Sequence, residues 1–194
     1  MIQQIPEVVV LRLPLYVRTL ANLERQGIEV VSSRELGAQL QMTPAQIRKD
    51  LTYFGRFGKQ GRGYNVGYLL TELRRILGLD RDWTMVLVGV GRLGRAILSY
   101  GRFAPNRFKV VAIFDKDPAQ IGKKVGNLTI QNAAELESVV RSQDVKVGIV
   151  SVPPPEAQTT IDAMVKCGIE AILNYAPIAA QIPPDVKIRD IDPI

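Results

Sequence analysis

The chain has 194 residues, 46% of them hydrophobic and 23% charged, which is typical of a globular protein with one large or two compact domains. It contains no histidine and a single cysteine, Cys167, so the sequence argues against zinc sites and histidine-based catalysis. We find no apolar run of membrane length and no secretory leader, and one cysteine cannot form an internal disulfide. We therefore expect a cytoplasmic protein with no membrane partner.

The excess positive charge lies in the first part of the chain. Residues 1–79 carry 11 Lys and Arg against 6 Asp and Glu, a net charge of +5, whereas residues 80–194 carry 14 against 13, a net charge of +1. Such a concentration favours a polyanionic partner. The patterns also differ, because helical periodicity dominates the first region and short β-branched runs alternate with helices in the second. We predict two domains, residues 1–79 and residues 80–194, joined near residues 78–83.

Helix signals begin the first domain. Residues 15–26 have helical periodicity and are followed by a glycine, which is typical of a helix end. Ser32 and Glu35 have the spacing of a capping box, in which the hydroxyl and the carboxylate each satisfy a backbone N–H at the start of a helix. A second, short helix is therefore expected to run to about Leu40.

A third helix follows after a brief turn. Thr43 and Pro44 suit its first positions, and its pattern continues to Phe54. Two short helices joined by a tight turn predict a helix-turn-helix over about residues 16–55. A further helix over residues 66–77 is expected to lead out of the domain.

The third helix and the loop after it carry the candidate DNA contacts. These are Arg48, Lys49, Thr52 and Tyr53 on the helix, and Lys59 and Arg62 in a glycine-rich stretch over about residues 56–65. The glycine-rich stretch resembles the wing of a winged-helix domain. Arg48 and Lys49 are candidates to read guanine in the major groove, and the other residues to contact phosphates, base edges or the minor groove. The alternative is an ordinary solvated basic surface, and the role of each residue stays open.

A glycine motif begins the second domain. Residues 84–88 read as a buried strand, and Gly89-Val90-Gly91-Arg92-Leu93-Gly94 follows it, leading into a helix to about residue 100. In a dinucleotide site the first glycine permits a tight turn, the second admits the pyrophosphate and the third allows close helix packing. Asp115 ends the next strand, where a carboxylate binds ribose hydroxyls and favours NAD(H), although Lys116 beside it weakens the case against NADP. The alternative is a glycine turn without a ligand.

The rest of the second domain predicts a Rossmann-type, doubly wound parallel sheet. Buried strands are expected over residues 145–150 and 171–173, with a helix between them over residues 155–167. Because ligands bind at the carboxyl ends of such strands, the loops after these two strands are candidates for the nicotinamide side of the site. They contribute Ser151, Val152, Pro153, Asn174, Tyr175, Ala176 and Pro177. These loops could equally need proline only for stiffness.

A regulatory protein explains these features better than an enzyme does. A dehydrogenase needs a proton donor near the nicotinamide, and this chain has no histidine and no Tyr-x-x-x-Lys pair. Cys167 is expected in the core, because no base partner is visible. The alternatives are an NAD-dependent oxidoreductase with a basic accessory domain, and a DNA-binding domain with an unliganded α/β oligomerisation module.

The whole chain resembles the Rex family of bacterial redox-sensing transcriptional repressors. The resemblance rests on the stretches over residues 46–55, 58–64, 89–94, 114–118 and 174–177, which read QIRKDLTYFG, GKQGRGY, GVGRLG, FDKDP and NYAP. It implies an α/β chain with an N-terminal winged helix-turn-helix domain followed by a Rossmann-type domain. It also implies a homodimer that binds palindromic operator DNA and leaves it when NADH binds, with NAD⁺ competing at the same site.

The resemblance assigns further residues. Tyr100 is similar to the residue that approaches the nicotinamide of the partner subunit, and Arg18 and Asp192 are similar to contacts that change with the bound nucleotide. The family continues beyond Asp192 into a C-terminal helix that exchanges between subunits, whereas this sequence stops at Ile194. We therefore expect this helix to be missing, with consequences for the dimer and for DNA release.

Overall fold

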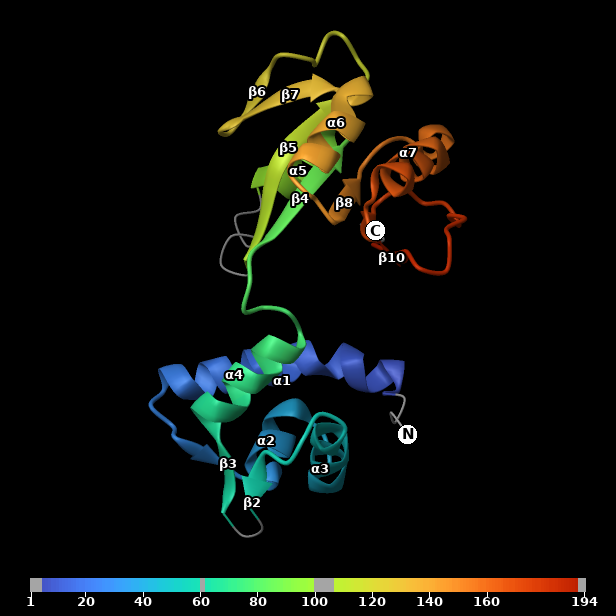
Figure 1. Cartoon of the computed structure of the whole chain (residues 1–194). Coiled ribbons are helices and arrows are strands. Elements are labelled where there is room, and N and C mark those ends of the chain that lie inside the picture. Colours follow the sequence, from blue (N-terminus) through green and yellow to red (C-terminus); the bar gives the residue numbers. More distant parts are fainter. Residues whose placement is uncertain (1–4, 60–61, 100–106, 192–194) are drawn as a thin grey trace. The chain divides into compact units, whose positions relative to one another are not determined.

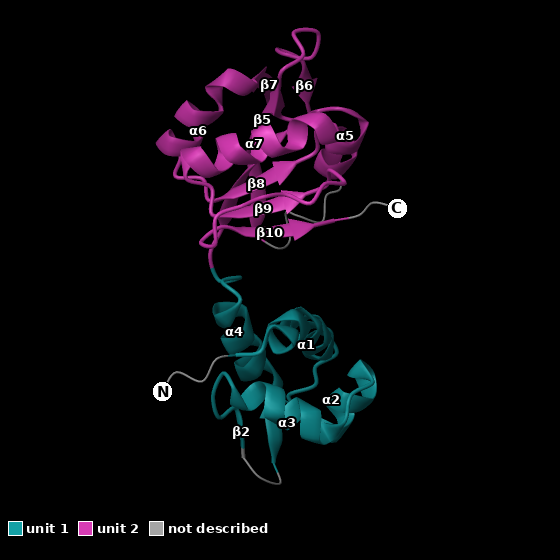
Figure 2. Ribbon diagram, turned by 90° about the vertical axis from the view of Figure 1, so that its right-hand side faces the viewer, with its two compact units in different colours: residues 1–80 teal, residues 81–194 magenta. Residues whose placement is uncertain are grey.

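The computed structural model describes residues 5–59, 62–99 and 107–191 (Figure 1). The chain forms two compact units, residues 1–80 and residues 81–194, which are coloured separately in Figure 2. One hydrophobic cluster belongs to the first unit, and two others belong to the second. Because each unit has a core of its own, each is described by itself.

The first unit combines helices with a small antiparallel sheet, and its described elements are α1 (Glu7–Arg25), β1 (Val30–Val31), α2 (Ser33–Leu40), α3 (Pro44–Thr52), β2 (Gly58–Lys59), β3 (Gly63–Asn65) and α4 (Val66–Ile76). The strands lie in the order β1-β3-β2. The short helices α2 and α3 contact each other, and the β2–β3 hairpin follows them, as Figure 1 shows. This is the winged helix-turn-helix arrangement that the sequence predicts.

Local hydrogen bonds set where the short helices begin. The Ser32 hydroxyl accepts from the backbone N–H of Glu35 at 3.1 Å, and the Glu35 carboxylate accepts from the backbone N–H of Ser32 at 2.8 Å. The Thr43 hydroxyl accepts from the backbone N–H of Gln46 at 3.2 Å, with Pro44 in the first turn. The predicted capping box and the predicted start of the third helix are therefore confirmed.

Helix α1 is longer than the sequence analysis expects. The prediction of a helix over residues 15–26 is wrong at its start, because α1 begins at Glu7 and runs through Pro14. A proline inside a helix removes one backbone donor and usually interrupts the helix. Here Pro14 points to solvent, while a stripe of apolar side chains on the opposite face packs into the core on both sides of it, namely Val9, Leu13, Tyr16, Leu20 and Leu23. Burial of this stripe outweighs the local preference of the proline.

The second unit is an α/β sandwich. Its described elements are β4 (Trp83–Val88), α5 (Arg92–Ser99), β5 (Phe108–Asp115), β6 (Lys124–Val125), β7 (Leu128–Asn132), η2 (Ala133–Glu135), α6 (Leu136–Ser142), β8 (Val147–Val150), α7 (Pro154–Cys167), β9 (Ala171–Asn174) and β10 (Lys187–Asp190). The strand order is β10-β9-β8-β4-β5-β7-β6, and among the described strands of this sheet only the β6–β7 pair is antiparallel. This is the predicted doubly wound sheet.

Strand β4 buries both of its faces. Val86 and Val88 pack with residues of α6 and α7 on one side, whereas Met85 and Leu87 pack with Ile97 of α5 on the other. Period-two alternation explains this division, because neighbouring side chains of a strand point to opposite faces. In the sheet β4 lies between β5 and β8, so the order in which successive strands are added reverses at β4. Ligands of open α/β sheets bind at the carboxyl end of such a strand.

Some elements of the second unit have no clear sequence signal. Strands β6, β7 and β10 and helix α6 are absent from the prediction. Only Ile130 is buried in β7, and β10 has no fully buried residue, so neither strand shows a strong apolar pattern. Cys167, by contrast, is buried at the end of α7 in the core, as expected, and burial raises the pKa of its thiol.

Candidate functional site

Helix α3 separates an inner face from an outer one. Ile47 and Leu51 are buried in the core of the first unit, whereas Arg48, Lys49 and Thr52 are exposed. The predicted helix end at residue 54 is two residues too late, and Tyr53 and Phe54 lie half-buried just after the helix. An amphipathic helix of this kind can bury one stripe and present the other to a DNA groove.

A buried carboxylate fixes α3 to α1. Asp50 is fully buried, and Arg12 donates from Nε to Asp50 Oδ2 at 2.7 Å and from Nη2 to Oδ1 at 2.8 Å. The Tyr16 hydroxyl also donates to Oδ2 at 2.8 Å, and Gln46 Nε2 donates to Oδ1 at 2.6 Å. A buried charge is tolerated only when it is paired and hydrogen-bonded, and this one has four donors.

The same cluster shifts the proton affinity of its members. Burial, together with the hydrogen bond to Asp50, raises the pKa of Tyr16 well above its ordinary value. The hydrogen bond to Asp50 likewise raises the pKa of Arg12. Tyr16 therefore stays a neutral donor and Arg12 stays charged, so the cluster holds α3 in one orientation. Sequence reasoning missed it, although an acidic residue in the middle of a basic helix was a usable signal.

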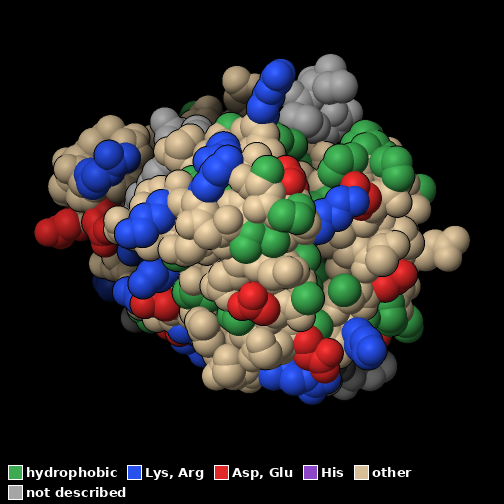
Figure 3. Space-filling model, turned by 90° about the horizontal axis from the view of Figure 1, so that it is seen from above, with side chains coloured by type: hydrophobic (Ala, Val, Ile, Leu, Met, Phe, Trp, Pro, Cys, Tyr) green, Lys and Arg blue, Asp and Glu red, His purple; other side chains and the backbone are tan. Residues whose placement is uncertain are grey.

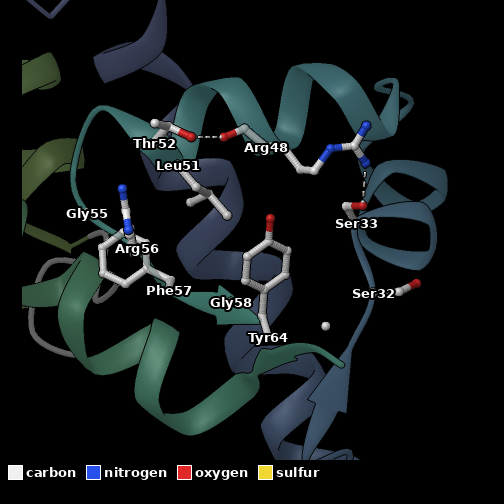
Figure 4. Close-up of a pocket in the computed structure, with 11 residues that line it drawn as sticks. Ser32, Ser33, Arg48, Leu51, Thr52, Gly55, Arg56, Phe57, Gly58 and Tyr64 are labelled. Carbon is white, nitrogen blue, oxygen red and sulfur yellow. Dashed lines mark hydrogen bonds between the residues drawn. The ribbon is translucent and has the colours of Figure 1, made fainter. Parts of the chain in front are cut away.

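A basic pocket lies between α2, α3 and the β2–β3 hairpin (Figure 4). Its volume is about 710 Å³, and its lining is Ser32, Ser33, Arg48, Leu51, Thr52, Gly55, Arg56, Phe57, Gly58, Gly63 and Tyr64. Arg48 extends along it and donates from Nη1 to the Ser33 hydroxyl at 3.0 Å. Thr52 donates from Oγ1 to the backbone carbonyl of Arg48 at 2.7 Å. Two guanidinium groups and the hydroxyl groups of Ser32, Ser33, Thr52 and Tyr64 give this pocket the chemistry of an anion site.

The hairpin has the geometry of a short wing. Gly58 pairs with Tyr64 and Lys59 pairs with Gly63, while Arg62 is exposed in the turn. Gly63 has a φ of +73°, and a Cβ there would lie 2.7 Å from the carbonyl oxygen of Val31. Only glycine suits this position, because a side chain would be strained and would collide with β1. The backbone of the predicted wing is therefore built around its glycines.

The glycine turn after β4 has space for a Cβ atom at Gly91 but none at Gly89 or Gly94. Gly89 has a φ of +97°, and a Cβ there would lie 2.5 Å from the carbonyl oxygen of Ser151. A Cβ at Gly94 would collide with the carbonyl oxygen of Gly89. At Gly91, chain neighbours aside, no heavy atom of the described residues lies within 4 Å of a built Cβ. A pyrophosphate can approach the backbone closely only where no other atoms fill the space, and Gly91, the second glycine of the motif, is the position with such space. The turn therefore fits a dinucleotide.

Asp115 lies next to this turn. Its Oδ2 accepts from the backbone N–H of Val90 at 2.8 Å, and its Oδ1 accepts from the backbone N–H of Asp117 at 3.0 Å. Ser151 also reaches the turn, since its hydroxyl donates to the carbonyl oxygen of Gly89 at 2.8 Å. The ends of β4, β5 and β8 thus bring together a glycine turn, a half-buried carboxylate and a hydroxyl, which the sequence placed far apart.

The remaining candidates differ in exposure. Arg92, Lys116, Pro153 and Pro177 are exposed, Leu93, Val152 and Tyr175 are half-buried, and Val90, Asn174 and Ala176 are buried. Asn174 uses its amide inside the fold: Nδ2 donates to Asp190 Oδ1 at 2.8 Å, and Oδ1 accepts from the backbone N–H of Ala176 at 3.0 Å. Burial raises the pKa of Tyr175. Asn174 therefore shapes its loop, whereas Tyr175 and Pro177 present surface.

The residues assigned by resemblance to the switch are only partly covered by the structure. Arg18 is exposed on α1, two residues after Tyr16. Tyr100 and Asp192 lie outside the described residues. The side chain of Lys59 is likewise outside them, although its backbone belongs to β2.

The described residues also bear on metal and membrane sites. Among the residues that the structure describes, no group of three or more Cys, Asp or Glu side chains is arranged to hold a metal ion. None of the described helices is both long enough and apolar enough to cross a membrane. On the face drawn in Figure 3, Lys and Arg side chains lie among Asp and Glu side chains and small groups of hydrophobic ones.

Each unit matches a protein-family model. Residues 4–52 match the model described as "Putative DNA-binding protein N-terminus", and residues 80–178 match the model described as "CoA binding domain". The first match ends with α3, and the second includes the glycine turn and the sheet as far as β9. The two families therefore divide the chain between a DNA-binding part and a nucleotide-binding part.

Full-length relatives match both parts together. The redox-sensing transcriptional repressor Rex of Chloroflexus aggregans is 51% identical over 191 residues, which cover 98% of this chain and 90% of that protein. The crystal structure of RSP in complex with β-NAD⁺ and operator DNA is 37% identical, with a TM-score of 0.94, and the match covers 97% of this chain and 87% of that one. The structure of RSP in complex with β-NADH is 35% identical, with a TM-score of 0.88, and covers 96% and 87%.

Proposed function

Because the chain belongs to the Rex family of redox-sensing transcriptional repressors, we propose that its two units act as one switch. It is a repressor and not an enzyme, and its ligands are operator DNA and the nicotinamide dinucleotides NAD⁺ and NADH. In this proposal, NADH binds the second unit and lowers the affinity of the first for DNA. The nucleotide is then a signal and is not consumed.

One observation carries this proposal most directly. A basic recognition helix held by a buried ion pair and a glycine turn with open space at Gly91 occur in one chain. The relative solved with β-NAD⁺ and operator DNA carries both kinds of ligand at once. A protein that holds both can let one report on the other.

On the DNA side, we assign different roles to neighbouring residues of α3. Lys49 is exposed on the outer face and is our candidate for a base contact in the major groove. Arg48 reaches toward Ser33 in the basic pocket, which Arg56 also lines, and this supports a phosphate contact in place of the guanine contact that the sequence suggested. Thr52, Tyr53, Lys59 and Arg62 complete the proposed interface with the backbone or the minor groove.

On the nucleotide side, the turn at Gly91 and the first turn of α5 are proposed to hold the pyrophosphate. Asp115 would accept hydrogen bonds from the adenosine ribose. The loops over residues 151–153 and 174–177 would line the nicotinamide side, with Tyr100 approaching it from the partner subunit. NADH supplies the redox signal here, and the protein residues only bind and orient it.

We further propose that the protein acts as a cytoplasmic homodimer on palindromic DNA. Two-fold symmetry of an operator mirrors that of a dimeric helix-turn-helix protein. Arg18 and Asp192 are proposed to exchange partners between the two nucleotide states. NADH can shift the equilibrium only through a higher affinity for the state that does not bind DNA.

A mobility-shift experiment tests this function. The full chain is mixed with palindromic operator-like DNA and titrated with NADH and, separately, with NAD⁺. We expect release of the DNA at a much lower concentration of NADH than of NAD⁺. DNA binding that is unchanged by either nucleotide would instead support a DNA-binding protein with an unliganded α/β module.

A further inference from the structure

An ion pair connects the two loops that flank the glycine turn. Lys116 Nζ lies 2.7 Å from Glu156 Oε1. Lys116 directly follows strand β5, and Glu156 lies in the first turn of α7, which follows strand β8. Strand β4, which ends in the glycine turn, lies between β5 and β8 in the sheet. The pair therefore links the loop that carries the proposed ribose-binding carboxylate to the first turn of α7, which follows the loop over residues 151–153.

Lys116 is a cation next to the proposed ribose-binding carboxylate. It is the immediate neighbour of Asp115, whose oxygens accept from the backbone at Val90 and Asp117. In dinucleotide-binding folds, an acidic residue at this point favours a free ribose 2′-hydroxyl, and a nearby cation accommodates a 2′-phosphate. The sequence by itself places both signals side by side: Asp115 favours NAD(H), and Lys116 weakens the case against NADP(H).

The structure gives this cation a partner other than a ligand. We propose that Glu156 is a specificity determinant, which holds Lys116 and so withholds its charge from a 2′-phosphate, favouring NAD(H) over NADP(H). Glu156 acts through Lys116 and is a positioning residue. The nearby Arg95 of α5 is also engaged, because its Nη2 donates to Gln120 Oε1 at 2.8 Å. This inference rests on the proposed function, since it presumes a dinucleotide at the glycine turn.

The test compares NADPH with NADH on the full chain carrying Glu156→Gln. The amide keeps the size of the side chain and removes the charge that holds Lys116. Exposed ion pairs are worth up to about 1 kcal/mol, so we expect NADPH affinity to rise by about three- to fivefold, with NADH affinity unchanged. Calorimetric titration gives both dissociation constants. Because a freed lysine attracts phosphate electrostatically, the gain should shrink as salt is raised.

Two further variants make the test decisive. Glu170→Gln removes one partner of Lys146, whose Nζ lies 3.1 Å from Glu170 Oε1 at the amino ends of β8 and β9 and also 3.0 Å from Asp144 Oδ1. The substitution should leave the NADPH to NADH ratio unchanged. Lys116→Met combined with Glu156→Gln should abolish the gain, because the cation is gone. An unchanged ratio in Glu156→Gln, or the same gain in the double variant, would overturn the role of Glu156 and leave the proposed function standing. Failure of the unaltered chain to bind NADH would overturn both.

Discussion

The two units hold their candidate contacts in different ways. On the proposed DNA face, the candidate contacts are charged side chains such as Arg48 and Lys49, and a buried ion pair at Asp50 orients the helix that carries them. At the proposed nucleotide edge, the main candidate contacts are backbone groups, and their position depends on glycines that lack a side chain. Substitutions that remove a charge should therefore affect the first unit most, and substitutions that add a side chain at a glycine should affect the second unit most.

The largest effect is expected for Asp50→Ala in the first unit. The change leaves Arg12, whose side chain is 22% exposed, without its partner, and it leaves the buried Tyr16 hydroxyl with only a weaker acceptor, Met42 Sδ at 3.9 Å. Breaking a buried ion pair costs about 3–5 kcal/mol, and we expect about 3 kcal/mol because Arg12 reaches solvent. Chemical unfolding measures the loss, and DNA binding should fall with it.

Glu72→Ala is the matched control for Asp50→Ala. It breaks an exposed pair within one helix, Arg75 Nη2 to Glu72 Oε2 at 2.7 Å. Exposed pairs contribute little because water and salt screen them, so the unfolding transition should hardly move. Equal losses in the two variants would contradict the view that burial makes Asp50 important.

A charge is also expected to matter at one point of the second unit. Asp115→Ala removes the proposed ribose acceptor and should weaken NADH binding by about 1.5–3 kcal/mol, the usual contribution of a hydrogen bond to a charged group. DNA binding without nucleotide should not change. Asp117→Ala is the control, because Asp117 Oδ1 only accepts from the backbone N–H of Ala119 at 2.8 Å. The same NADH affinity in Asp115→Ala and the parent would sink the ribose assignment.

Substitutions at two glycines distinguish space that a ligand needs from space that the fold needs. A methyl group at Gly91 meets no described heavy atom within 4 Å beyond its chain neighbours, so Gly91→Ala should fold normally and lose NADH affinity by about 1–3 kcal/mol, as overpacking does elsewhere. Gly89→Ala should instead destabilise the second unit, because its Cβ would press on the Ser151 carbonyl at a φ of +97°. Thermal unfolding and NADH titration of both variants check this. Normal NADH binding by Gly91→Ala would argue against a pyrophosphate at the turn.

The effects that depend most on the DNA sequence are expected on the outer face of α3. Lys49→Ala should weaken the binding free energy by about 1–3 kcal/mol on operators that keep the base pair read by Lys49. On operators in which that base pair is replaced, the substitution should have no effect. Arg48→Ala should weaken binding to all variants alike and lower the salt slope by about one. Fluorescence anisotropy on a set of base-substituted operators distinguishes the two patterns. Exchanged patterns would mean that Arg48, and not Lys49, reads the base.

The sequence predicted best what depends on neighbouring residues. The capping box of Ser32 and Glu35, the start of α3 at Pro44 and the glycine turn after β4 are all local patterns, and all three are confirmed. Each depends on backbone conformation or on hydrogen bonds within a few residues, so the sequence carries the whole signal.

What the sequence could not predict depends on distant residues. Arg12 and Asp50 are 38 positions apart, and although an acidic residue inside a basic helix is a signal, nothing in the local sequence identifies Arg12 as its partner. The first turns of α1 were missed because Pro14 argues locally against a helix that the core stabilises. Glu156 was overlooked for the same reason, since only the sheet order brings it to Lys116.

The central claim is that the two units are coupled, and reciprocal binding tests it most directly. NADH is titrated into the full chain with and without saturating operator DNA, and DNA is titrated with and without saturating NADH. Linkage requires that each ligand weaken the other by the same factor. We predict equal factors well above one. An NADH affinity that is the same with and without operator DNA would contradict the account.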